Sequence, residues 1–275
     1  MHKRKLLKIS KTYGTVYIMK NNMEKSYKVK RNIKRLISNV FTILFLIILI
    51  YIYSSENKKL EKNEINNVSI TNTINSIQAI PEYSGEICID INNNIPFFTE
   101  DEMTEEVFET YSELDEFGRC GVAYANICVD LMPKEGEERD RLFYKPTGWH
   151  QKVYNGDEVL YNRCHLIAWQ LGNENENINN LITGTSALNE AMNQFEMLVG
   201  NKVRAKYRKG NKIHVLYRVT PDFRGDNLVA NGVLMEAKSV EDNGQSICFN
   251  KYIYNVQAGF EIDYLTGFSE QIIKN

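Results

Sequence analysis

The sequence predicts an α+β domain built on a mostly antiparallel sheet. Residues 213–220, 229–237 and 247–257 are short, mostly apolar runs typical of strands. Residues 186–203 carry apolar side chains at the three- and four-residue spacing of a helix. Strands with only two or three helices among them favour this class over an alternating β/α arrangement.

The earlier part of the domain adds shorter elements. Residues 86–91, 122–131 and 159–169 are expected to be strands, residues 105–114 a helix, and residues 145–149 a turn that contains Pro and Gly. From about residue 80 to the C-terminus, no internal repeat and no second linker interrupts the chain, so one domain is expected.

The net charge of −2 conceals two segments of opposite sign. Residues 1–55 contain twelve Lys and Arg and one acidic residue, whereas residues 56–275 contain 21 basic and 34 acidic residues. A split of this size indicates separate tasks. Four parts are expected: a basic cytoplasmic arm (1–35), a membrane-directed segment (36–55), a weakly structured linker (56–79) and the folded domain (80–275).

The membrane-directed segment is short. Residues 40–53 read VFTILFLIILIYIY without a charge, and all the basic residues of the first segment precede them. Basic residues stay on the cytoplasmic side, so the chain after this run should lie outside. The run fits the apolar core of a signal peptide, and an extension back to residue 36 can just span a bilayer. The domain is therefore either held by a single-pass signal anchor in the cell membrane or secreted after cleavage.

Composition and cysteine spacing exclude several classes of protein. Apolar residues make up 43% of the chain and charged residues 25%, which is ordinary for a globular protein and excludes collagen-like, disordered and polytopic membrane proteins. The five cysteines are widely spaced and form no C-x-x-C pair, so no zinc ribbon or thioredoxin motif is indicated.

Candidate chemistry begins in the segment Tyr161–Trp169. In a strand, Arg163 and His165 point to one face and Asn162 and Cys164 to the other. Cys164 and His165 therefore cannot face each other as a nucleophile and its base. A guanidinium beside an imidazole can instead bind a phosphate next to a general base.

The following helix offers a second set of polar residues. Thr185 or Ser186 can cap it, and Asn189 and Glu196 lie two turns apart on one stripe. Spacing alone is more typical of a solvated helix face. The stripe expected to face the core consists of Leu188, Met192, Phe195 and Val199.

These residues carry a resemblance to a known family. Asn162-Arg163-Cys164-His165, followed by NNLITGT and an Asn on the next helix, resembles the DNA/RNA non-specific endonucleases of the ββα-metal (His-Me finger) superfamily, in particular the exported, streptococcal-type nucleases of Gram-positive bacteria. The resemblance extends over residues 80–268. It includes residues 118–127, 145–150, 215–244 and 255–267.

The resemblance implies a role for each matching residue. The family motif Asp-Arg-Gly-His matches Arg163 and His165, while Asn162 and Cys164 depart from it and are expected to point away from the site. His165 would be the general base, neutral when it takes a proton from water. Arg163 would bind a phosphate oxygen.

The metal site implied by the resemblance lies on the helix. Asn189 would bind one Mg²⁺, with Mn²⁺ as the alternative, and several waters would complete the shell. Asn180 would support the site, and Glu196 would orient water around the metal. The substrate would be DNA, and RNA as well, hydrolysed to products with a 5′ phosphate.

A basic stretch follows the helix. Residues 201–224 carry a net charge of +7, because they contain eight Lys and Arg and a single acidic residue, Asp222. This stretch is either a solvated surface or a track for the phosphate backbone, and no motif for reading base sequence is present. Its members are Lys202, Arg204, Lys206, Arg208, Lys209, Lys212, Arg218 and Arg224.

Two other functions remain open at this stage. A catalytically inactive relative could bind extracellular nucleic acid, for instance in DNA uptake, and a membrane-anchored interaction protein could share the fold alone. His165 and Asn189, both present, favour the enzyme.

Overall fold

The computed structural model describes residues 69–272, residues 44–56 and six single positions (23, 25, 28, 30, 34 and 40). The chain divides into two compact units, Met1–Asn63 and Glu64–Asn275. In the first, residues 44–56 are helical; the remainder of the expected membrane-directed segment, apart from residue 40, lies outside the described residues. Among the described residues, no helix combines the length and the apolar character needed to cross a bilayer.

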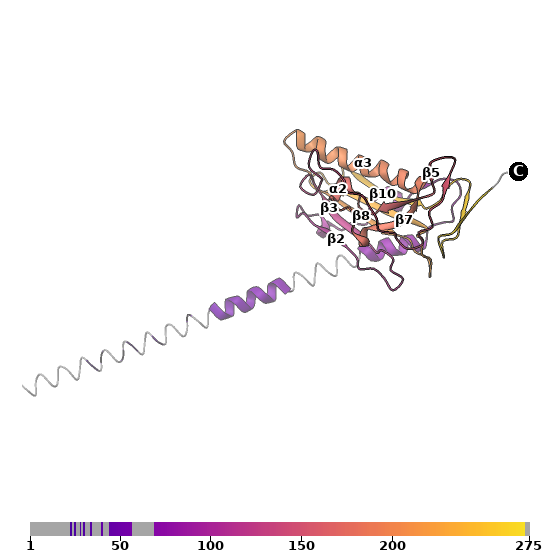
Figure 1. Ribbon diagram of the computed structural model, residues 1–275. Coiled ribbons are helices and arrows are strands. Elements are labelled where there is room, and N and C mark those ends of the chain that lie inside the picture. Colours follow the sequence, from indigo (N-terminus) through magenta and orange to yellow (C-terminus); the bar gives the residue numbers. More distant parts are fainter. Residues whose placement is uncertain are drawn as a thin grey trace, which may run out of the picture. The chain divides into compact units, whose positions relative to one another are not determined.

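The second unit is built on a six-stranded antiparallel sheet with the order β1-β10-β9-β8-β3-β2, which confirms the mixed α/β class and the mostly antiparallel sheet (Figure 1). The expected strands at 86–91, 122–131, 213–220, 229–237 and 247–257 each overlap one of these strands. The strands are β1 (Cys88–Asp90), β2 (Glu109–Tyr111), β3 (Ala123–Ile127), β8 (Val215–Pro221), β9 (Gly232–Ser239) and β10 (Cys248–Tyr254).

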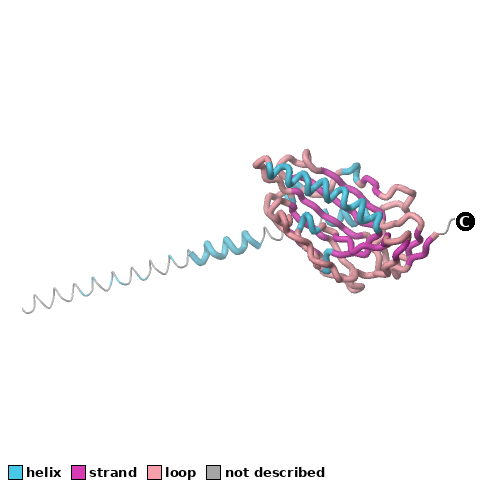
Figure 2. The backbone as a smooth tube through the Cα atoms, turned by 45° about the horizontal axis from the view of Figure 1, so that its top comes forward, coloured by secondary structure: helices cyan, strands magenta, loops and turns pink. Residues whose placement is uncertain are grey.

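The long helix α3 (Ser186–Arg208) lies across one face of this sheet (Figure 2). Its first turn is capped by Thr185, whose Oγ1 accepts a hydrogen bond from the backbone N–H of Leu188. Leu188, Met192 and Val199 are buried in the main core, as expected. Burying an aliphatic side chain of this size contributes about 1.5–3 kcal/mol, so this face fixes the position of α3.

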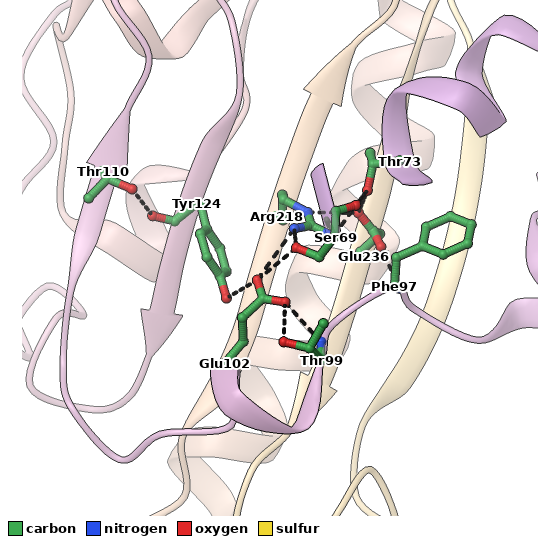
Figure 3. A network of polar contacts seen from close by, with 9 residues as sticks. All are labelled: Ser69, Thr73, Phe97, Thr99, Glu102, Thr110, Tyr124, Arg218 and Glu236. Carbon is green, nitrogen blue, oxygen red and sulfur yellow. Dashed lines mark hydrogen bonds and ion pairs between the residues drawn. The ribbon is translucent and has the colours of Figure 1, made fainter. Parts of the chain in front are cut away.

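The opposite face of the sheet is covered by segments from before β2. Residues 69–78 form a helix, in contrast to the expected weakly structured linker over 56–79. Its Ser69 and Thr73 are buried because both accept hydrogen bonds from the guanidinium of Arg218 on β8, at 2.8 and 3.0 Å (Figure 3). Residues 57–68 lie outside the described part, so the position of the linker there remains a prediction.

A smaller sheet carries the candidate site. Strands β6 (Tyr161–His165) and β7 (Leu181–Thr185) pair antiparallel, and α3 begins directly after β7. The short helix α2 (Trp169–Gly172) follows β6. The remaining elements are η1 (Asn92–Asn94), η2 (Glu100–Glu102), η3 (Ile178–Asn180), β4 (Val153–Tyr154), β5 (Glu158–Val159), β11 (Phe260–Ile262) and β12 (Ser269–Gln271).

The expected helix at 105–114 is wrong. The structure has the edge strand β2 there, paired with β3 through Glu109, Thr110 and Tyr111. Tyr111 packs against the main core, and the Thr110 hydroxyl donates to the carbonyl of Tyr124. Glutamates and leucine favour a helix locally, but pairing with β3 overrides that preference.

Candidate active site

The end of β6 and the first turns of α3 meet around one pocket. His165 is the last residue of β6, and Asn189 lies in the first turn of α3 because β7 leads straight into that helix. The pocket measures about 240 Å³. Its lining residues are Arg139, His165, Ala168, Trp169, Gln170, Asn189, Asn193 and Glu196.

Hydrogen bonds fix the tautomer of His165. Nε2 lies 2.8 Å from the backbone oxygen of Asn175, which can only accept, so Nε2 carries the ring proton. Nδ1 lies 3.2 Å from a guanidinium nitrogen of Arg139, which can only donate. In the neutral ring, Nδ1 therefore presents its lone pair on the side of Arg139.

His165 is held neutral at ordinary pH. Burial lowers its pKa from 6.5 to about 4, and the positive charge of Arg139 acts in the same direction, against the hydrogen bond to Asn175. A neutral imidazole with an available lone pair is the form that a general base requires.

Arg139 was not predicted from the sequence. It lies in an acidic loop at 135–140 that has no periodicity, and only the fold brings it to His165. Asn175 holds it there, since its Oδ1 accepts from Nε of Arg139 at 2.8 Å and its Nδ2 donates to the carbonyl of Asp140 at 2.9 Å. Asn175 thus contacts both His165 and Arg139, through its backbone and its side chain respectively.

Asn180 supports the end of β6. Its fully buried side chain bonds both backbone groups of Ile167, at 2.8 Å through Oδ1 and 2.9 Å through Nδ2. Its own backbone oxygen accepts from Leu166. These bonds fix the two residues that follow His165, although Asn180 itself does not line the pocket.

Cys164 is closer to the pocket than the alternation of side chains suggests. It points away from the His165 face of β6 but lies under α3, where its thiol donates to Oδ1 of Asn189 at 3.3 Å. A side chain on Gly184 would come within 2.4 Å of this sulfur. The departure from the family's glycine therefore fills space beneath Asn189 and orients its amide.

Glu196 is buried in the wall of the pocket. It is 7% exposed, and burial raises its pKa from 4.5 to about 8, against the attraction of Arg139. The polar stripe expected on α3 is thus divided: Glu196 is buried, while Asn189 and Asn193 are exposed.

The pKa of Glu196 predicts a pH effect on stability. A carboxyl with a raised folded pKa stabilises the fold fully below its unfolded pKa, and this contribution is lost as pH rises through the folded pKa. In EDTA, we expect the free energy of unfolding, and with it the melting temperature, to fall more between pH 5 and 9 in the wild type than in Glu196→Gln. The difference in free energy is on the order of a few kcal/mol. Equal pH slopes in thermal melts of the two proteins would contradict the assignment.

Arg163 does not line the pocket. Its Nε donates to the carbonyl oxygen of Tyr144, and its guanidinium lies over the ring of Trp149, 4.5 Å from the centroid. It shares a face of β6 with His165, as the strand alternation predicts, and its side chain is half-buried.

The basic stretch is smaller than its charge suggests. Arg218 is fully buried in the opposite face of the sheet, and Arg224 pairs with Asp222 and Glu82, so neither belongs to one basic surface. Arg204 donates to the carbonyl of Gln170 in α2.

The other basic residues named for substrate binding lie at the far end of α3. Lys202, Lys206 and Arg208 follow Asn189 by about 20 to 28 Å along the helix axis, at about 1.5 Å per residue. Lys206 lies 3.8 Å from Asp242.

The comparisons with known proteins agree with this geometry. The sequence profile of the DNA/RNA non-specific endonuclease family matches residues 99–241. A deoxyribonuclease of Streptococcus dysgalactiae subsp. equisimilis is 31% identical over 147 residues, which cover 50% of this chain and only 43% of that relative.

Two solved structures share the fold. NucA from Streptococcus agalactiae, with magnesium bound, has a TM-score of 0.59 and 26% identity, and the match covers 73% of this chain and 95% of that one. NucA with no metal bound gives the same score and identity, over 73% and 94% of the two chains. The profile match covers more than half of the 275 residues and includes His165, Asn189 and Glu196, and the chain belongs to the DNA/RNA non-specific endonuclease family.

Proposed function

We propose that this protein is a metal-dependent endonuclease that hydrolyses the phosphodiester bonds of DNA, and of RNA as well, without sequence specificity. The observation that carries the proposal is the neutral His165, whose Nδ1 lone pair lies in a pocket shared with Asn189 and Glu196. The arrangement of β6, β7 and α3 around this pocket is that expected of a ββα-metal motif.

The donor set fits a single hard cation. Asn189 offers a neutral amide oxygen at the pocket, and Glu196 offers a buried carboxyl in the same wall. Oxygen donors suit Mg²⁺, which keeps most of its waters and needs few protein ligands. In the described part of the chain no three His, Cys, Asp or Glu side chains gather as a metal cage. When bound, Mg²⁺ would neutralise charge that develops on the phosphate and the leaving oxygen.

The protein groups would divide the remaining work. Nδ1 of His165 would take a proton from the attacking water while the Asn175 carbonyl holds Nε2–H in place. Arg139 would release Nδ1 and pair with a phosphate oxygen, which is the stronger acceptor for a guanidinium. Arg163 would bind a neighbouring phosphate, and Asn180 would keep the end of β6 in position.

Metal removal gives a direct test. Purified protein should nick and linearise supercoiled plasmid in Mg²⁺ or Mn²⁺, and excess EDTA should remove this activity until Mg²⁺ is restored. Single-stranded DNA, duplex DNA and RNA should be compared side by side. No cleavage with either metal would instead favour the inactive nucleic-acid-binding or DNA-uptake protein, and cleavage undiminished by EDTA would contradict the metal.

Cys164 provides a second test through Asn189. Cys164→Ala removes the donor to Oδ1 of Asn189, and we expect the Mg²⁺ concentration for half-maximal cleavage to rise by about tenfold, as for other residues that orient metal ligands. Cys128→Ala is the matched control, because Cys128 is also fully buried but directly follows β3, whereas Cys164 bonds Asn189. An equal Mg²⁺ dependence in both variants would show that the thiol does not position Asn189.

The site of action is inferred from the N-terminal charges. Twelve basic residues precede the apolar run at 40–53, and this order directs the following chain across the cytoplasmic membrane. The nuclease domain would then act outside the cell membrane, either tethered through residues 36–55 or secreted after cleavage.

A further inference from the structure

Two exposed aromatic rings stack on each other, and one of them follows the tryptophan that contacts Arg163. The rings of His150 and Phe268 lie 3.9 Å apart between centroids, with 19° between their planes. Both residues are exposed, and Phe268 retains 60% of its accessible surface. They come from segments more than a hundred residues apart, so the fold brings them together.

Two glycines make this contact possible. Gly148 and Gly267 both have positive φ, at 65° and 85°. A side chain on Gly267 would come within 1.9 Å of the backbone oxygen of Gly148, so the two turns are in direct backbone contact. The Tyr161 hydroxyl also donates to the carbonyl of Gly267 at 3.0 Å. The close contact between the two turns therefore brings together the segments that carry the two rings.

The stack is tied to the strand that carries the candidate base. Thr183 lies opposite Arg163 in the β6–β7 pair, and its hydroxyl donates to the carbonyl of Thr147 at 2.7 Å. Trp149, next to His150, lies under the Arg163 guanidinium. Same-face neighbours on a strand, such as Arg163 and His165, are about 6.5–7 Å apart. The segment that carries His150 is thus packed, through Thr147 and Trp149, against the two strands that carry Arg163 and His165.

We propose that His150 and Phe268 form a stacking platform for an unpaired base of single-stranded nucleic acid, whose backbone is held by Arg163 while its scissile phosphate lies at His165. Aromatic faces bind any base without reading its sequence, and a cation beside them binds the phosphate. Phe268 also lines a hollow with Glu261, Asp263 and Glu270, whose carboxylates disfavour phosphates there. The stacked rings therefore suit an uncharged base. Paired bases in a duplex are stacked on their neighbours and cannot present their faces to the rings. This inference rests on the proposed function.

Binding without cleavage tests the platform. The full-length His165→Ala chain, which serves as the non-cleaving parent, is kept in EDTA at fixed salt. It is titrated into labelled oligothymidylate and, separately, into a labelled duplex of equal phosphate count. Binding is followed by fluorescence anisotropy. We expect Phe268→Ala and His150→Ala to weaken oligothymidylate binding by about tenfold and duplex binding by less than about twofold. Phe268→Leu, which keeps the apolar contact but lacks the aromatic face, should lose as much as Phe268→Ala.

An exposed aromatic pair elsewhere supplies the control. Tyr83 is exposed and contacts Tyr254 edge to face, so Tyr83→Ala should leave binding unchanged. Equal losses on both oligonucleotides, full binding in Phe268→Leu or a loss in Tyr83→Ala would overturn the platform. If the parent binds neither oligonucleotide, the proposed function fails; if it binds both and the platform variants bind as well, only the platform fails.

Discussion

Replacing His165 by alanine is expected to lower the rate of DNA cleavage by about a thousandfold, because a positioned general base contributes about 10²–10⁴-fold. The variant loses the only lone pair directed toward Arg139 in the pocket, and no other side chain there offers a neutral nitrogen base. The measurement is the initial rate of plasmid cleavage in saturating Mg²⁺. Circular dichroism of the same samples should show an unchanged fold.

A second buried histidine provides the control for this variant. His214 is 3% exposed and bonds Glu241 through Nδ1 at 2.6 Å, but it does not line the pocket. His214→Ala should lower stability and leave the cleavage rate of the folded protein within about twofold, since removal of a buried polar partner costs about 1–3 kcal/mol. Wild-type cleavage by His165→Ala would mean that another group activates the water.

Replacing Arg218 by leucine is expected to cost about 3–5 kcal/mol of unfolding free energy, the range for breaking a buried ion pair from one side. The guanidinium is fully buried, 2.8 Å from Glu236 and 3.6 Å from Glu102, and its loss leaves both carboxylates buried without their cation. Ser69 and Thr73 lose an Arg donor as well. Urea unfolding followed by fluorescence measures the change.

An exposed ion pair calibrates this effect. Lys251 pairs with Asp90 at the surface, and Lys251→Ala should cost less than about 1 kcal/mol. Arg218→Leu should also leave the cleavage rate per folded molecule unchanged, because Arg218 faces away from α3 and the pocket. A midpoint shift in urea no larger than that of Lys251→Ala would show that the network contributes little.

Local patterns predicted those parts of the site that lie on regular elements. Alternation in β6 placed Arg163 and His165 on one face, and the spacing in α3 identified the core stripe, although Glu196, expected on the neighbouring polar stripe, is buried. These inferences succeed because strand and helix periods fix side-chain direction within one element. The roles of the matching residues came from the family resemblance, and they remain proposals.

Contacts between distant segments could not be predicted in this way. Arg139 reaches His165 only because Asn175 binds its loop, and Arg218 was counted among surface charges although strand alternation puts it on a buried face. The edge strand β2 was taken for a helix because its partner β3 is not visible from its own residues. In each case a tertiary partner, absent from the local sequence, decides the outcome.

The bonds from Arg218 to Ser69 and Thr73 also limit where the chain can be cut without loss of contacts in the folded domain. A protease acting before residue 69 would release the domain with all four groups around the guanidinium intact. A cut between Thr73 and β1 would detach two of them and open the face of the sheet that they cover. A cut that leaves this network complete must therefore lie on the N-terminal side of Ser69, upstream of the boundary at residue 80 that the composition suggests.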